Sequence, residues 1–178
     1  MAGTGVGTVT SSPSGIACTS GSACSSSFID GTSVQLTANA GLTSLFSGWT
    51  DCSGSVGNVC PIVMGSDKTV TATFSLKQYV ITVAGAGVNG GTISDGNDIS
   101  ATWNGLTLSG TKTRTVNHGS GPYTITATAI TGVTVTWSGN CDSVSGNKTG
   151  TATCTINTGI AAAKNVTATF SLKTTGRK

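Results

Sequence analysis

Apolar and polar residues alternate over short segments along most of the chain. Val34, Leu36 and Ala38 fall on one face of such a segment, and residues 133–137 repeat the pattern with threonine at the intervening positions. This two-residue period predicts β-strands with one buried and one solvent-facing side. The best helix candidate, residues 158–164, is too short for more than about one turn. The pattern therefore predicts an all-β protein.

An identical eight-residue sequence, Val-Thr-Ala-Thr-Phe-Ser-Leu-Lys, stands at residues 70–77 and again at residues 166–173. Identity over eight consecutive positions indicates an internal repeat. The correspondence continues toward the amino terminus, where Trp49 aligns with Trp137 and Cys60 with Cys154. We therefore expect two tandem domains, residues 1–77 and residues 78–178.

The two repeats differ at their openings. Residues 79–83, Tyr-Val-Ile-Thr-Val, form an expected strand that opens repeat 2, and no equivalent stands before Gly7 in repeat 1. Repeat 1 is therefore expected to be truncated or open at its first strand. Repeat 2 carries an inserted segment at about residues 95–123 and lacks the first cysteine pair of repeat 1. An open strand edge invites a strand from another chain, which gives a hypothesis of head-to-tail or donor-strand assembly.

Composition supports the β assignment. Only 8% of the 178 residues are charged, 26 are glycine, and glutamate is absent. Helical surfaces normally use glutamate, lysine, alanine and leucine, whereas threonine suits strands and glycine suits turns. The expected fold is two small antiparallel modules, each a β-sandwich or a β-grasp-like sheet without a substantial helix.

The chain has six cysteines, and their even number and spacing suit disulfides better than a zinc site. Six cysteines allow 15 connectivities, and the local spacing favours three short-range bridges that would staple these small cores. Disulfides in turn imply an oxidising compartment. The expected pairs are Cys18–Cys24, Cys52–Cys60 and Cys141–Cys154.

The scattered charge argues against nucleic acid as a partner, and the lack of long apolar runs argues against a membrane span. The formal net charge of +3 is scattered along the chain, so there is no dense basic face for nucleic acid. No apolar run approaches the length of about 18 residues that a membrane span needs. Met1 leads directly into Ala2 and Gly3 without an apolar leader, so Met1 is interpreted as an added start on a mature segment.

Candidate metal and ligand residues lie in the inserted segment. Asp95 and Asp98 place oxygen donors in one short loop, which could hold calcium, but an Asx-turn explains the same residues. Trp103 and Tyr123 could stack against a sugar, although core packing accounts for them as well. No cofactor is expected.

Catalytic chemistry is poorly supported. His118 and Ser120, with Asp98 or Asp142, could form a nucleophile–base–acid set. His118 nevertheless stands in a glycine-rich turn, where an ordinary loop histidine is the simpler interpretation, so the chain is not expected to be an enzyme.

A family resemblance then emerges from the first repeat. Gly-Thr-Val-Thr-Ser-Ser-Pro-Ser-Gly-Ile-Ala-Cys at residues 7–18, Phe-Ser-Gly-Trp at 46–49 and Val-Thr-Ala-Thr-Phe at 70–74 resemble divergent internalin-type B-repeats of secreted bacterial proteins. The resemblance implies a location outside the bacterial cell or on its surface, and a structural role as a stalk, spacer or adhesion segment. Other copies of the chain or neighbouring repeats are possible partners. The alternatives are a self-assembling, pilus-like filament subunit that uses strand complementation and a carbohydrate- or calcium-binding module.

Overall fold

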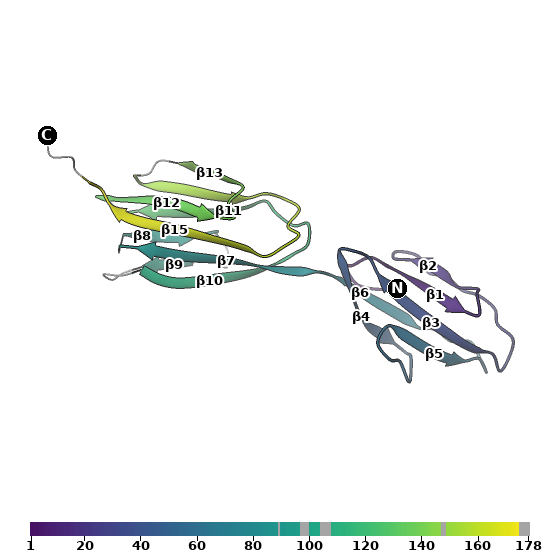
Figure 1. The fold of residues 1–178 in the computed structure, drawn as a ribbon. Helices are drawn as coiled ribbons and strands as arrows, with labels where there is room; N and C mark the ends of the chain where they lie inside the picture. Colours follow the sequence, from purple (N-terminus) through teal and green to yellow (C-terminus); the bar gives the residue numbers. More distant parts are fainter. Residues whose placement is uncertain (89, 97–99, 104–107, 147–148, 175–178) are drawn as a thin grey trace. The chain divides into compact units, whose positions relative to one another are not determined.

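The computed structural model describes residues 1–88, 90–96, 100–103, 108–146 and 149–174. It divides into two compact units, Met1–Lys77 (unit 1) and Gln78–Lys178 (unit 2), at the junction of the two sequence repeats (Figure 1). All the regular secondary structure of the described residues is β-strand, so each unit is an all-β module.

Unit 1 packs two sheets around one core. The first sheet has the strand order β2-β1-β3-β5, and the second pairs β4 with β6. The strands are β1 (Gly7–Ser12), β2 (Ala17–Thr19), β3 (Ser33–Ala40), β4 (Ser44–Thr50), β5 (Val59–Val63) and β6 (Thr71–Leu76).

Unit 2 repeats this arrangement with larger sheets, in the orders β10-β7-β15-β12 and β13-β14-β11-β8-β9. By the sequence repeat, β8, β11, β12, β14 and β15 correspond to β1, β3, β4, β5 and β6. The strands are β7 (Gln78–Gly87), β8 (Gly91–Ser94), β9 (Ser100–Trp103), β10 (Leu108–Asn117), β11 (Tyr123–Ala129), β12 (Val133–Gly139), β13 (Ser143–Gly146), β14 (Thr151–Ile156) and β15 (Lys164–Leu172).

One strand pair of unit 2 departs from the expected antiparallel arrangement. β7 and β15 are adjacent and parallel, with Lys164 opposite Ile81 and Phe170 opposite Gly87. Parallel neighbours require a long connection, and here the connection is the rest of unit 2, because β7 is its first strand and β15 its last. The other strand ladders of the described residues are antiparallel.

The same aromatic contact anchors both cores. Phe74 on β6 and Phe170 on β15 are fully buried, and each ring lies against the glycine that opens a facing strand. A Cβ on Gly7 would come within 2.3 Å of the Phe74 ring, and a Cβ on Gly91 would come equally close to the Phe170 ring. The Gly-Thr-aliphatic motif at each repeat start therefore has a packing reason: only glycine leaves room for the ring.

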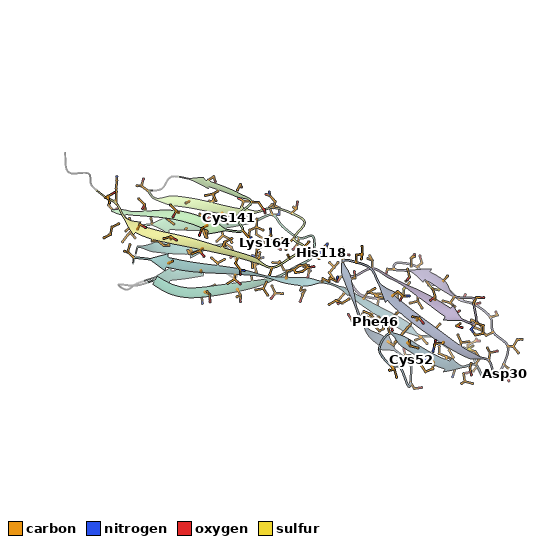
Figure 2. The ribbon with its side chains drawn as sticks, viewed as in Figure 1. Asp30, Phe46, Cys52, His118, Cys141 and Lys164 are labelled. Atoms are coloured by element: carbon orange, nitrogen blue, oxygen red, sulfur yellow. A yellow bond between two sulfur atoms is a disulfide. The ribbon has the colours of Figure 1, made fainter. Side chains whose placement is uncertain are left out.

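Three disulfides, Cys18–Cys24, Cys52–Cys60 and Cys141–Cys154, tie neighbouring segments within the units. Cys60 and Cys154 are fully buried on β5 and β14, while Cys52 and Cys141 lie in the segments that follow β4 and β12 (Figure 2). Within unit 1 the bridge ties the segment after β4 to β5, and within unit 2 the equivalent bridge ties the segment after β12 to β14.

Candidate functional site

An ion pair ties the inserted segment of unit 2 to the rest of the core. Arg114, on β10, pairs with the carboxylate of Asp95, whose side chain is only 2% exposed and lies just after β8. The Arg114 guanidinium also lies 4.8 Å from the ring centroid of Tyr123 at the start of β11. Since β10 belongs to one sheet and β8 and β11 to the other, Arg114 connects the two sheets.

This geometry gives two residues of the expected ligand sites a structural explanation. The carboxylate of Asp95 already faces a guanidinium, and Tyr123 packs partly against the core under the same side chain. Asp98 lies outside the described residues, and of Trp103 the structure gives the backbone, as the last residue of β9. Among the described residues, no group of three or more histidine, cysteine or acidic side chains could hold a metal.

Two described members of the hypothetical catalytic set, Ser120 and Asp142, make their hydrogen bonds with backbone groups. The Ser120 hydroxyl donates a hydrogen bond to the carbonyl oxygen of Asn117. The ring of His118 lies 5.9 Å from that of Tyr79, and within the described residues its buried Nδ1 has no hydrogen-bond partner. Asp142 instead accepts a hydrogen bond from the backbone N–H of Asn157 at 2.8 Å.

The other distinctive feature is an open sheet edge in unit 1. Val70 and Val166 occupy the same position of the repeated sequence, yet Val166 is 1% exposed and Val70 is only half-buried. In unit 2, β7 runs beside residues 164–170. In unit 1, β4 pairs with one side of β6 as far as Thr71, and the described residues place no strand on the other side of residues 68–71. We call this empty strand position the strand slot.

Only the end of the slot is filled. Ala2 forms a parallel bridge with Thr73, the same register in which Ala86 pairs with Thr169 in unit 2. The Ala2 N–H donates to the carbonyl of Ala72, and Phe74 donates back to the carbonyl of Ala2. Residues 1–3 therefore occupy the position of the last residues of β7.

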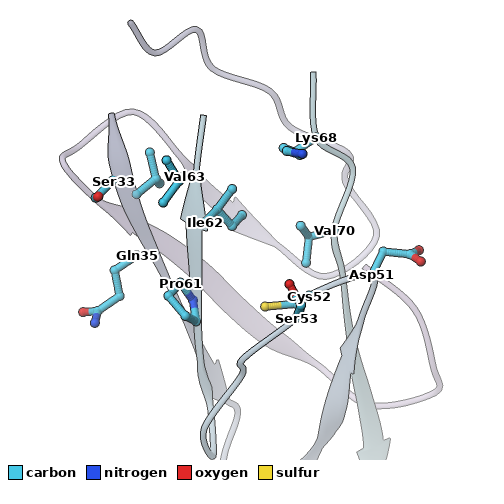
Figure 3. A pocket seen from close by; sticks show the side chains of 11 residues that line it. Ser33, Gln35, Asp51, Cys52, Ser53, Pro61, Ile62, Val63, Lys68 and Val70 are labelled. Carbon is cyan, nitrogen blue, oxygen red and sulfur yellow. The ribbon is translucent and has the colours of Figure 1, made fainter. Parts of the chain in front are cut away.

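Two hollows are lined in part by residues 68–72. One, of about 630 Å³, is lined by Lys68 and Val70 on one wall and by Ile62 and Val63 of β5 on another (Figure 3). A second, of about 300 Å³, reaches from residues 69–72 to Val9 of β1. The face that β7 covers in unit 2 is therefore incompletely covered in unit 1.

Sequence comparison identifies the first repeat. Residues 2–78 match the family model of the divergent InlB B-repeat domain. This part of the chain belongs to that family. The match ends at the boundary between the two units, so the kinship of the second repeat rests on the internal sequence identity. No curated protein matches the chain.

Two solved structures illustrate the wider comparison. A bacterial adhesin from Mobiluncus mulieris containing intramolecular disulfide, isopeptide and ester bond cross-links is 13% identical over 79% of this chain, with a TM-score of 0.38. The major pilin from Streptococcus pyogenes is 10% identical over 78% of this chain and 68% of its own, with a TM-score of 0.25. This chain spans 58% of the adhesin chain.

Two features were not anticipated from the sequence. Arg114 is one of the scattered charges of the chain, although it stands in the inserted segment with an acid 19 positions earlier. The half-exposure of Val70 was also missed, although the missing opening strand of repeat 1 was the signal for it. No helix of the described residues is long and apolar enough to cross a membrane.

Proposed function

We propose that the chain is a load-bearing structural module of a bacterial surface protein, serving as part of a stalk or spacer. The B-repeat membership of residues 2–78 and the three disulfides support a place outside the reducing cytosol. The observation that carries the proposal is the parallel pairing of the first and last strands of unit 2.

Tension on a tandem repeat enters each unit through its termini. In unit 2 the force acts on the amino end of β7 and the carboxyl end of β15, which lie at opposite ends of the same parallel ladder. The pairing from Lys164–Ile81 to Phe170–Gly87 is then loaded in shear, so its hydrogen bonds share the force. A ladder loaded this way resists extension better than one whose bonds break singly.

The connection between the units suits the same role. β6 ends at Leu76 and β7 begins at Gln78, so only Lys77 separates the two strands. A connection without glycine- or serine-rich sequence has little of the freedom of a flexible linker. Tension would therefore pass from one unit to the next without a long slack segment.

Single-molecule force spectroscopy on the full chain tests this function. Attachment at the two termini of unit 2 is expected to give a much higher unfolding force than attachment at Gln78 and Ala163. Ala163 is exposed and lies just before β15, so the second geometry peels β7 from β15 one bond at a time. Equal forces in the two geometries would contradict the load-bearing function.

A further inference from the structure

The open edge of unit 1 has a defined hydrogen-bonding pattern. Ala72 and Phe74 exchange hydrogen bonds with Ala2, and alternate residues of a strand point their backbone groups to the same side. Val70 therefore presents its N–H and C=O to the strand slot. Within the described part of the chain, residues 68–70 make no backbone hydrogen bond.

We infer that the strand slot of unit 1 is an acceptor site for an extended strand of the β7 type, which runs parallel to β6 and leads into Met1. Unit 2 supplies the pattern of the occupant. There β7 places Ile81 and Val83 inward, each 1% exposed, in register with Lys164 and Val166. The corresponding side chains in unit 1 would lie opposite Lys68 and Val70, over the hollow that reaches Val9.

The existing residues already continue such a strand. By the shared register, Met1 takes the position of Gly85, and its side chain packs against the unit 1 core. A strand equivalent to Gln78–Ala84 would thus end where Met1 begins, without displacing the Ala2–Thr73 bridge. Burying its two aliphatic side chains and covering Val70 would supply the driving force.

The source of the occupant is the connecting strand of a preceding repeat. In unit 2 the strand in this place follows Lys77, the last residue of the repeat before it, and ends at Gly87, where a Cβ would come within 2.0 Å of the carbonyl oxygen of Phe170. This assignment rests on the tandem, load-bearing organisation proposed above. It makes unit 1 complete only when the segment that joins it to a preceding repeat supplies the opening strand.

The test extends the full chain by Gln-Tyr-Val-Ile-Thr-Val-Ala ahead of residue 1, with Met1→Gly so that the added segment continues as β7 does. Hydrogen exchange measured by mass spectrometry should show the amides of Val70 and Ala72, which face the slot, protected at least about tenfold more than in the chain carrying Met1→Gly alone. The unfolding force of unit 1 between its termini should rise in parallel.

Two matched controls isolate the cause. One carries threonine at the two inward positions of the added strand, and the other has one extra alanine before residue 1, which turns the aliphatic side chains outward. Both should lose most of the gain. No added protection with the β7-type extension, or equal protection with the controls, would overturn the inference.

The source is tested with a free synthetic peptide of sequence Gln-Tyr-Val-Ile-Thr-Val-Ala at equimolar concentration. Little protection is expected, because the fused strand acts at a much higher effective concentration. Protection equal to that of the fusion would assign the slot to a separate chain and overturn a preceding repeat as its source. A high shear force in unit 2 with no gain in unit 1 would refute only the acceptor site, leaving the proposed function intact.

Discussion

The two units share the same eight residues near their carboxyl ends but cover the adjoining face of the core differently. In unit 2, β7 lies beside β15 and β10 lies beside β7, so Val166 is buried. In unit 1, a loop held by Cys18–Cys24 lines the second hollow, with Ile16 and Phe28 packed partly against the core. Burial of an identical segment therefore depends on the neighbouring strand, which a different part of the sequence supplies.

β10, the strand that unit 2 has in addition, is held by both backbone pairing and a side-chain ion pair. β10 pairs with β7 over its full length, from Leu108 opposite Gly87 to Asn117 opposite Gln78. It lies at the edge of its sheet, and Arg114 fixes it to the other sheet through Asp95 and Tyr123. Unit 1 has no strand that corresponds to β10, and there the Cys18–Cys24 disulfide lines the hollow beside residues 69–72.

The largest effects are expected where the units are most alike. Phe74→Ala and Phe170→Ala each remove a fully buried ring packed on glycine, and should each lower the free energy of unfolding of their own unit by about 4 kcal/mol. Hydrogen exchange of the full chain, followed separately in the two units, measures this. Leu172→Ala, at a residue that is 69% exposed on β15, is the control and should change stability by less than about 0.5 kcal/mol. A similar loss for Leu172→Ala would contradict the shared anchoring role of the two rings.

The next effect should be confined to unit 2. Arg114→Ala leaves the Asp95 carboxylate buried without its guanidinium partner, which should cost unit 2 about 3 kcal/mol and raise exchange along β10. Lys112→Ala, at an exposed residue on the same strand, serves as the matched control. If both variants have the same stability, Arg114 does not tie the sheets together.

The all-β fold was predictable because its signal is local. Alternation of apolar and threonine positions marks each strand, and the repeated Val-Thr-Ala-Thr-Phe-Ser-Leu-Lys sequence marks the carboxyl end of each unit. The parallel pairing of β7 with β15 was not predicted, because it joins residues some 83 positions apart. Nothing in either strand alone specifies that neighbour.

The candidate sites also depend on contacts between residues that are distant in the sequence. The loop sequence alone makes Asp95 a candidate for calcium, while the partner that accounts for it, Arg114, comes from a strand of the other sheet. The open first strand of repeat 1, in contrast, was visible as a missing segment when the repeats were aligned. The internal repeat carries long-range information that a single segment lacks.

Removing one disulfide from each unit should sharpen the contrast between their covers. Replacing both cysteines of Cys18–Cys24 or of Cys141–Cys154 by alanine should cost the affected unit about 2–3 kcal/mol. Only the first change should also increase exchange around residues 69–72, because the bridged loop lines the hollow beside them. Equal exchange changes beside β6 and β15 would mean that the loop does not serve as the cover of unit 1.

The smallest predicted effect separates the two equivalent tryptophans. Nε1 of Trp137 donates a hydrogen bond of 3.1 Å to the carbonyl of Ala152, whereas Nε1 of Trp49 is buried without a partner in the described structure. Trp137→Phe and Trp49→Phe remove the same atoms, so the lost ring area largely cancels between them. Trp137→Phe should therefore be more destabilising by about 1 kcal/mol, the net worth of the bond. Hydrogen exchange followed separately in the two units measures the difference. A larger loss of stability for Trp49→Phe than for Trp137→Phe would contradict the assignment of the stabilising indole hydrogen bond to Trp137.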